Sequence, residues 1–513
     1  MNGAQALIRT LVDAGVDVCF ANPGTSEMHF VAALDEVPEM RAVLTLFEGV
    51  AAGAADGYAR MAGRPAATLL HLGPGFGNAV ANLHNARRAR TPLVNVVGDH
   101  ATTHKRYDAP LESDLDALAG VVSGWYRRSL STADLADDAA QAVAAAQSGA
   151  GCIATLVLPA DVSWGEGGQV APPRRPRGRS PVRPELLEEV VLGKDSVLFL
   201  GGDALTPEGL LAAGRVAAQT GARLMCQTFP ARLARGAGLP FVQNLPYAPE
   251  PALEALADVR HLVLVGAQEP VAFFAYPGLP GSFVPEGCQV QVLAEPGDDA
   301  TRALVDLAAL VAPDAEPEVA PAGRPELPTG PLTPARIAAV LGALLPENAI
   351  VVDEALTSGS KLLAATAGAP RHDWLTLTGG AIGQGLPAAL GAAVACPDRP
   401  VIGVQADGSA MYTIQSLWTY AREQLDVTTI LCNNGAYAIL DGELQRVGAA
   451  QDGKRARQLL DLGSPDLDFV ALAHGMGVPA TRATTSEELA EQLAAALAEP
   501  GPHLIDAVLA ARP

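Results

Sequence analysis

Residues 406–439, ADGSAMYTIQSLWTYAREQLDVTTILCNNGAYAI, carry the side chains best suited to chemistry. Asp407 follows one short apolar run, and Asn434 follows the next. Because the carboxyl ends of neighbouring parallel strands meet at one edge of a sheet, we expect these two side chains to lie close together. Carboxylate and amide oxygens suit Mg²⁺, which completes its octahedral shell with phosphate oxygens and water. The pair therefore predicts a site for magnesium and a diphosphate.

Two residues beside Asp407 favour the same interpretation. Gly408 allows the backbone to approach a ligand closely, and Ser409 stands at the start of the next helix, where it can bind an anionic oxygen. A DG turn alone is a common connection between a strand and a helix, so most of the signal lies in the two strand-end ligands taken together.

The DGS…NN pattern resembles the motif of thiamine diphosphate enzymes, usually written GDG followed by about two dozen residues and NN. This chain has Ala406 where that motif begins with glycine. The resemblance extends over essentially the whole chain, and benzoylformate decarboxylase and the acetolactate synthase large subunit are the similar members. It implies a 2-oxo acid decarboxylase or carboligase with thiamine diphosphate and Mg²⁺ as cofactors.

The resemblance also implies which residues contact the cofactors. Asp407, Asn434 and the carbonyl of Ala436 would bind Mg²⁺. Ser409 and Tyr437 would contact the diphosphate. Two further residues, Thr357 and Gly408, are also expected to contact thiamine diphosphate.

Two segments would bind the pyrimidine half of the cofactor. In TGGAIGQGLPAALG (378–391), the carbonyl of Gly380 would accept from the 4′-amino group, and Ile382 would hold the cofactor in a bent shape. In AVLTLFEGVAAGAADGYARMAG (42–63), Glu48 would be the acid that binds the pyrimidine N1′ and activates the cofactor.

Three histidine- or threonine-bearing loops are expected on the substrate side. NPGTSE (22–27) resembles the loop of benzoylformate decarboxylase that binds the substrate carboxylate, here through Thr25. His71, at the end of an apolar strand, matches a catalytic histidine that also contacts the substrate. His100 follows another strand and is a second catalytic candidate. Imidazole side chains suit proton transfer near neutral pH.

The implied reaction is the non-oxidative decarboxylation of a 2-oxo acid through an enamine intermediate. The product would be an aldehyde or, with a second carbonyl acceptor, a carboligation product. In this family the activating glutamate and the diphosphate site come from different subunits. The resemblance therefore implies a homodimer or homotetramer with active sites at the subunit interface.

An alternative within the same class is a carboligase similar to acetolactate synthase that works without FAD. The FAD segment of acetolactate synthases, with its arginine and aspartate cluster, is not found in this sequence. The corresponding stretch is VGAQEPVAFFAYPG (265–278). We therefore expect no FAD.

A non-catalytic paralogue is a less favoured alternative. The retained Glu48, Asp407 and Asn434 argue against it, because ligands are expected to be lost first when catalysis is lost. A nucleotide-dependent dehydrogenase is disfavoured because the sequence has no GxGxxG motif.

Two proline-rich stretches predict how the chain divides into domains. Residues 171–184 and 312–334 have the composition of extended, solvated linkers. By the resemblance, they separate a pyrimidine-binding domain (1–170), a central Rossmann-like domain (185–311) and a domain that binds diphosphate and Mg²⁺ (335–513).

Short apolar runs alternate with helical stretches in the two outer domains. The expected strands are 16–20, 42–46, 66–72 and 92–98 in the first domain and 349–353, 400–406 and 427–433 in the third. Near-continuous apolar strands between helices are typical of parallel sheets that are covered on both faces. The predicted fold class is therefore α/β, with three doubly wound parallel-sheet domains.

Charge and composition limit the classes of partner. Lysine and arginine total 35 and aspartate and glutamate total 56, which gives a formal net charge of −21 at pH 7. Because such a protein repels phosphate backbones and anionic membranes, we expect no nucleic-acid partner.

No apolar run of about 18 residues appears, which predicts no membrane span. The lack of a signal peptide and the six scattered cysteines predict a cytoplasmic protein.

Overall fold

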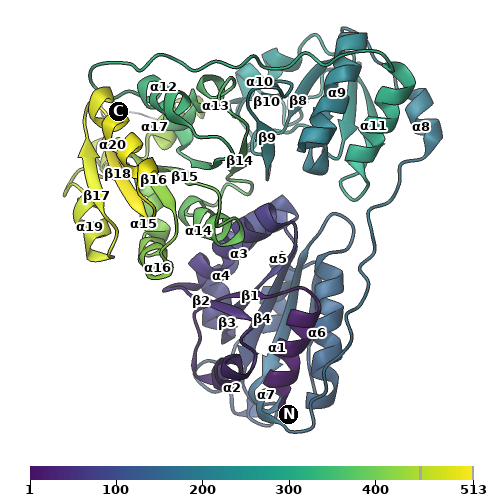
Figure 1. Ribbon diagram of the computed structural model, residues 1–513, viewed down its shortest axis with the longest axis vertical. Helices are drawn as coiled ribbons and strands as arrows, with labels where there is room; N and C mark the ends of the chain where they lie inside the picture. Colours follow the sequence, from purple (N-terminus) through teal and green to yellow (C-terminus); the bar gives the residue numbers. More distant parts are fainter. Residues whose placement is uncertain (450–452, 511–513) are drawn as a thin grey trace.

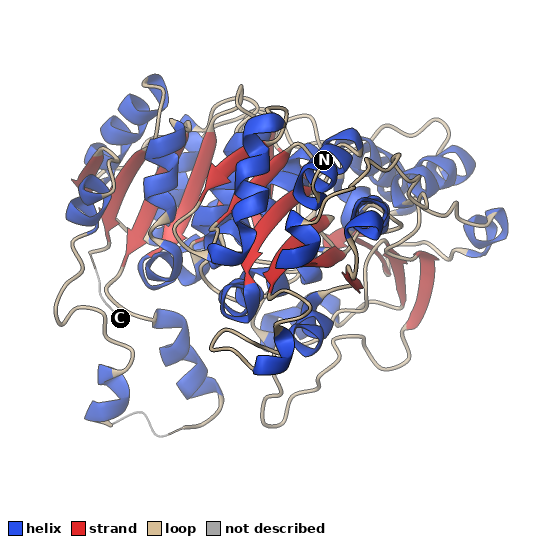
Figure 2. Cartoon of the chain, turned by 90° about the horizontal axis from the view of Figure 1, so that it is seen from below, coloured by secondary structure: helices blue, strands red, loops and turns tan. Residues whose placement is uncertain are grey.

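The computed structural model describes residues 1–449 and 453–510. The chain forms three α/β units, each built around its own sheet. Figure 1 shows the first unit in purple and blue at the bottom, the second in teal at the upper right and the third in green and yellow at the left. Figure 2 shows helices on either side of the strands.

The first sheet has six strands in the order β2-β1-β3-β4-β6-β5, and all of its pairings are parallel. The strands are β1 (Val18–Ala21), β2 (Arg41–Leu44), β3 (Ala66–His71), β4 (Leu93–Asp99), β5 (Trp125–Arg128) and β6 (Ile153–Pro159). The helices are α1 (Gly3–Asp13), α2 (Met28–Ala33), α3 (Glu48–Ala62), α4 (Leu72–Ala89), α5 (Leu115–Val122), α6 (Thr132–Ala146) and α7 (Ala160–Trp164). Because β1, β3 and β4 are neighbours, the loops that follow them share one edge.

The second sheet has five parallel strands in the order β10-β8-β7-β11-β12. The strands are β7 (Ser196–Leu200), β8 (Arg223–Cys226), β10 (Gln243–Asn244), β11 (His261–Val265) and β12 (Gln289–Ala294). The helices are α8 (Pro184–Glu189), α9 (Pro207–Thr220), α10 (Pro249–Leu256) and α11 (Ala300–Val311). The strand order reverses beside β7, as in Rossmann-like sheets.

The third sheet has seven strands in the order β17-β18-β16-β15-β13-β14-β9. The strands are β9 (Leu233–Arg235), β13 (Ile350–Glu354), β14 (His372–Thr376), β15 (Val401–Ala406), β16 (Val427–Asn433), β17 (Ala480–Ala483) and β18 (His503–Val508). The helices are α12 (Pro334–Leu344), α13 (Leu362–Ala365), α14 (Gly385–Ala395), α15 (Asp407–Thr413), α16 (Ser416–Glu423), α17 (Ala438–Arg446), α18 (Lys454–Gln458), α19 (Phe469–Gly475) and α20 (Ser486–Ala498). Strand β9 pairs antiparallel with β14, and the other pairings are parallel.

Helices α3 and α14 join the first unit to the third (Figure 1). Both are rich in alanine and glycine and buried along most of their length. A Cβ atom at Gly57 would overlap the carbonyl of Ala388, so a larger residue there would force the helices apart. Side chains of both helices belong to one buried core that spans the two units. This contact fixes the first sheet relative to the third.

The predicted α/β class with three doubly wound sheets is confirmed. The predicted domain boundaries stay a prediction. Strand β9 lies within the predicted central domain, 185–311, and yet completes the third sheet, so the linkers do not separate the sheets completely. Within residues 1–449 and 453–510, no helix is long and apolar enough to cross a membrane.

Candidate active site

The carboxylate of Asp407 lies at the carboxyl edge of the third sheet, directly after β15. Strand β16 runs parallel beside β15, so the backbone after β16 reaches the same carboxylate. Its Oδ2 accepts from the N–H groups of Asn434 at 3.1 Å and Gly435 at 2.7 Å, and its Oδ1 accepts from that of Gly408 at 2.8 Å. Burial raises the pKa of Asp407, and these N–H groups oppose the rise. The backbone of Asn434 therefore lies within hydrogen-bonding distance of the Asp407 carboxylate.

Asp407, Asn434 and Ala436 would offer a metal ion one carboxylate, one amide and one backbone carbonyl oxygen. The Oδ1 atom of Asn434 accepts from the N–H of Ala436 at 3.0 Å, which holds this turn together. Across the described ranges, no three His, Cys, Asp or Glu side chains cluster as a metal site. Because protein carboxylates alone cannot fill the shell, Mg²⁺ here would need oxygens from a bound phosphate group.

The surroundings of this edge fit a diphosphate. The hydroxyl of Ser409 is buried, and nothing in the described part of the chain accepts from or donates to it. Gly408 faces the ring of Tyr437, and a side chain at 408 would overlap that ring. Thr357 is exposed in the short turn Leu356–Gly359 that follows β13, the strand beside β15. An unpaired buried hydroxyl beside the Asp407 carboxylate suits a phosphate oxygen.

Residues 378–384 form a loop that leads into α14. Gly380 has a φ of 76°, a left-handed conformation that favours glycine. Ile382 is half-buried. His84 lies 3.1 Å from the carbonyl oxygen of Gly379. Among the residues that the structure describes, no hydrogen bond to the Gly380 carbonyl is found, and its contact with the cofactor stays a prediction.

Glu48 is the first residue of α3 and is only 7% exposed. Asn78 donates from Nδ2 to the Oε2 atom of Glu48 at 3.0 Å. A Cβ atom at Gly75 would lie 3.0 Å from Oε1, so α4 approaches the carboxylate closely. Among the described residues, no hydrogen bond or ion pair joins Glu48 to Asp407. Asn78 was not singled out in the sequence, because only the packing of α3 on α4 brings it to Glu48.

His71 ends β3, and its Nδ1 atom lies 2.9 Å from Oε2 of Glu27. The carboxylate of Glu27 is fully buried and also accepts from the Ser26 hydroxyl and from the N–H of Gly24 at 2.7 Å. A buried carboxylate with these donors orients the imidazole through Nδ1 and leaves Nε2 for other partners. The sequence analysis included Glu27 only as part of NPGTSE, since its partner is 44 residues away.

The other two predicted residues lie at the same edge of the first sheet. Thr25 is exposed in the short helix Thr25–Glu27, which follows β1. His100 follows β4, and its buried Nε2 atom has no hydrogen-bond partner among the residues described. Its ring lies 5.4 Å from that of His104, measured between centroids. The structure thus gathers Thr25, His71 and His100 at neighbouring strand ends.

Comparison with known proteins identifies the two outer units. Residues 1–119 match the N-terminal TPP binding domain of thiamine pyrophosphate enzymes, and residues 360–507 match the C-terminal TPP binding domain. The chain belongs to the thiamine pyrophosphate enzyme family. The family predicted from the DGS…NN pattern is therefore confirmed, and the units that carry Glu48 and Asp407 are its two cofactor-binding domains.

Relatives of this thiamine pyrophosphate enzyme include decarboxylases and acetolactate synthases. IlvX of Mycobacterium tuberculosis, provisionally named an acetolactate synthase large subunit, is 63% identical over 513 residues, 99% of each chain. Benzoylformate decarboxylase of Pseudomonas aeruginosa is 32% identical over 522 residues, 96% of each chain. The solved thiamine diphosphate-dependent 4-hydroxybenzoylformate decarboxylase of Rhodococcus jostii RHA1 has a TM-score of 0.86, with 25% identity and 99% of each chain covered.

A cavity of about 1010 Å³ lies between the first and second units and also borders Thr378 and Gly379 of the third. It borders Gly202 after β7 and Gly266 after β11, and it also borders Arg87 and Arg90 at the end of α4. The expectation that this family member binds no FAD rests on the sequence of 265–278 and stays a prediction.

Proposed function

We propose that this family member is a Mg²⁺-dependent enzyme that removes CO₂ from a 2-oxo acid without oxidation. The remaining acyl unit leaves as an aldehyde or is joined to a second carbonyl compound. The observation that supports the proposal is that the Asp407 carboxylate accepts from the backbone N–H of Asn434 in the third unit, while Asn78 donates to the buried Glu48 in the first. When bound, thiamine diphosphate supplies the electron sink for loss of CO₂.

The third unit holds the metal and the diphosphate in this proposal. Asp407, Asn434 and the carbonyl of Ala436 bind Mg²⁺, and the buried hydroxyl of Ser409 donates to a phosphate oxygen. Tyr437 covers the backbone at Gly408, and that close approach supports its role beside the phosphates. Three further residues, Thr357, Gly380 and Ile382, complete the cofactor contacts.

Glu48 activates the cofactor by holding a proton at the pyrimidine N1′ position. Asn78 donates to Oε2 of Glu48, and this leaves Oε1 as the oxygen that can face the ring nitrogen. The carboxyl group is almost fully buried, so water competes little for that oxygen.

His71 moves the proton that completes aldehyde release. Glu27 accepts at Nδ1 of His71 and orients the imidazole, so Nε2 is the atom that donates toward the substrate. His100 offers a second imidazole whose Nε2 is unpaired among the described residues. The exposed hydroxyl of Thr25 binds the carboxylate of the 2-oxo acid.

The active site forms between subunits of a homodimer or homotetramer. Hydrogen bonds of Glu48 stay within the first unit and those of Asp407 within the third, so one chain does not join the two groups directly. A second copy is therefore proposed to bring Glu48 to the cofactor that Asp407 holds.

A second candidate function is carboligation as in acetolactate synthase, without FAD. The 63% identity to IlvX over nearly the whole chain favours it. A non-catalytic paralogue has less support, because the Glu48 and Asp407 contacts are those that a working site needs.

The test is a panel of 2-oxo acids offered to the purified protein with thiamine diphosphate and Mg²⁺. Released CO₂ is measured with and without an added acceptor aldehyde or 2-oxo acid. CO₂ release that depends on both cofactors supports the proposal, and the ratio of aldehyde to ligated product separates the two candidate functions. If no CO₂ is released from any acid although the cofactor binds, the non-catalytic alternative holds.

A further inference from the structure

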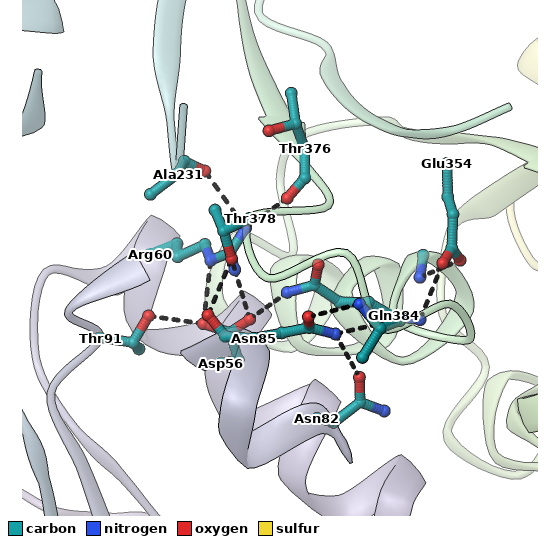
Figure 3. Close-up of polar contacts among 12 residues, drawn as sticks. Asp56, Arg60, Asn82, Asn85, Thr91, Ala231, Glu354, Thr376, Thr378 and Gln384 are labelled. Carbon is teal, nitrogen blue, oxygen red and sulfur yellow. Dashed lines mark hydrogen bonds and ion pairs between the residues drawn. The ribbon is translucent and has the colours of Figure 1, made fainter. Parts of the chain in front are cut away.

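The loop of residues 378–384 takes its shape from the first unit of its own chain. Figure 3 shows side chains of α3 and α4 reaching the backbone around this loop. The side chain of Asn82 donates to the carbonyls of Gly49 at 2.8 Å and Gly383 at 3.2 Å, so it connects the start of α3 to the loop. The loop is thus held from outside its own sheet.

Asn85 makes the contact nearest to the predicted cofactor residues. Its Nδ2 donates to the carbonyl of Ala381 at 2.7 Å, and its Oδ1 accepts from the N–H of the same residue at 3.2 Å. Ala381 stands between Gly380 and Ile382, so both peptide groups that flank its Cα are fixed. Asn85 is fully buried, which keeps water from replacing these bonds.

The loop also packs tightly against Asn85 and its neighbour on α4. A Cβ atom at Gly379 would lie 2.5 Å from Oδ1 of Asn85 and 2.8 Å from the His84 ring. The hydroxyl of Thr378 donates to the backbone carbonyl of Asn85 at 2.8 Å. The loop therefore lies against α4 without room to shift toward it.

The end of the loop is anchored separately. Gln384 donates to the buried carboxylate of Asp56, which also accepts from Arg60 and from the hydroxyl of Thr91 (Figure 3). Glu354 accepts from the N–H groups of Gly383 at 2.8 Å, Gln384 at 3.2 Å and Gly385 at 2.7 Å. Because the end is fixed in this way, loss of Asn85 alone should free the middle of the loop and leave its end in place.

We propose that Asn85 is a positioning residue that sets the Gly380 carbonyl and the Ile382 side chain for the pyrimidine half of the cofactor. The inference rests on the proposed function, because it assigns those two residues to thiamine diphosphate. Asn85 touches neither the metal ligands nor the Ser409 hydroxyl in any hydrogen bond of the described chain. Its loss should therefore weaken binding of the pyrimidine half and spare the diphosphate half.

The test compares Asn85→Leu with Thr91→Val in the full-length protein. Leucine has the same branched shape as asparagine but cannot form hydrogen bonds to Ala381, and Thr91→Val removes a donor to Asp56 without touching the loop. Affinities for thiamine diphosphate and for inorganic diphosphate, each with Mg²⁺, are measured by calorimetry. We expect Asn85→Leu to bind thiamine diphosphate about tenfold more weakly, with unchanged affinity for inorganic diphosphate, and Thr91→Val to match the wild type in both.

A second measurement does not depend on the cofactor. Hydrogen exchange at the amide of Ala381 should be faster in Asn85→Leu than in the wild type or Thr91→Val, because its acceptor is lost. If Asn85→Leu does not fold, Asn85→Ala serves in its place, since it also removes both hydrogen bonds to Ala381 and brings in no larger side chain.

Three results would overturn the role of Asn85. In Asn85→Leu, these are an equal loss of affinity for thiamine diphosphate and inorganic diphosphate, an unchanged affinity for thiamine diphosphate, and an unchanged rate of hydrogen exchange at the Ala381 amide. Failure of the wild type to bind thiamine diphosphate would instead contradict the proposed function, and with it the role toward the cofactor, whatever the exchange result shows about the loop.

Discussion

At the edge of the third sheet the carboxylate of Asp407 is held by three backbone N–H groups, whereas at the edge of the first sheet the imidazole of His71 is held by another side chain, that of Glu27. The first arrangement follows from the paths of β15 and β16 alone. The second requires that the loop after β1 and the end of β3 each present the right residue.

This difference shows where each half of the site can be damaged. Backbone donors survive most substitutions, so the proposed metal site at the third sheet should be lost mainly when a proposed ligand itself is changed. Side-chain pairs such as His71–Glu27 and Glu48–Asn78 can be weakened one bond at a time, which predicts graded effects.

The largest effect is expected for Asp407→Ala. The substitution removes the single carboxylate of the proposed metal site. It should abolish measurable binding of thiamine diphosphate, because Mg²⁺ would hold the diphosphate to this carboxylate. Calorimetric titration of the protein with thiamine diphosphate in the presence of Mg²⁺ measures this binding. The wild type titrated in EDTA should also show no binding. Wild-type affinity under either condition would show that the third sheet does not bind the cofactor through a metal.

His71→Ala should leave cofactor binding intact and slow the release of aldehyde. General acid–base catalysis typically contributes about 10² to 10⁴ in rate, and the loss should fall in that range. The rate of transfer to an added carbonyl acceptor should fall less, since bond formation with the acceptor replaces the protonation step. Equal loss of both products would place His71 at an earlier step, and no loss would make it structural.

Glu27→Gln should have a smaller effect than His71→Ala. Glutamine can still accept from Nδ1 of His71, but this hydrogen bond then lacks the charge of the Glu27 carboxylate. We expect aldehyde formation to fall by about tenfold, as for the loss of one charge-assisted hydrogen bond. The steady-state rate is compared with that of Ser26→Ala, which removes a donor to Glu27 and keeps the charge. A loss in Ser26→Ala as large as that in Glu27→Gln would assign the effect to packing.

Thr25→Ala should have the smallest effect. The loss of one hydroxyl that bonds to the substrate carboxylate should raise KM by about threefold to tenfold with little change in kcat. Thr25→Ser, which keeps the hydroxyl, is the matched control and should resemble the wild type. A change confined to kcat would contradict a role in substrate binding.

The sequence predicted the residues around Asp407, which backbone N–H groups hold, better than the residues around His71 and Glu48, which other side chains hold. The expected strands 400–406 and 427–433 agree with β15 and β16 to within one residue, so Asp407 and Asn434 follow directly from the alternation of apolar runs. Ligands that extend from the ends of adjacent strands need no knowledge of distant contacts.

The residues that the sequence analysis missed depend on contacts between distant segments. Glu27 meets His71, Asn78 meets Glu48 and Asn85 meets Ala381 only after helices and sheets have packed. The same reason applies to β9, whose three residues join the third sheet from within the predicted central domain. Local pattern carries no signal for such pairings.

The central claim is that the two halves have separate tasks, so that the third unit binds the cofactor and Glu48 activates it. Exchange of the thiazolium C2 proton for deuterium in the bound cofactor, followed by NMR after acid quenching, tests this directly in the wild type and Glu48→Gln. We predict that Glu48→Gln binds thiamine diphosphate with nearly wild-type affinity but exchanges this proton at least about 100-fold more slowly. Exchange at the wild-type rate in Glu48→Gln, at saturating cofactor, would contradict the account.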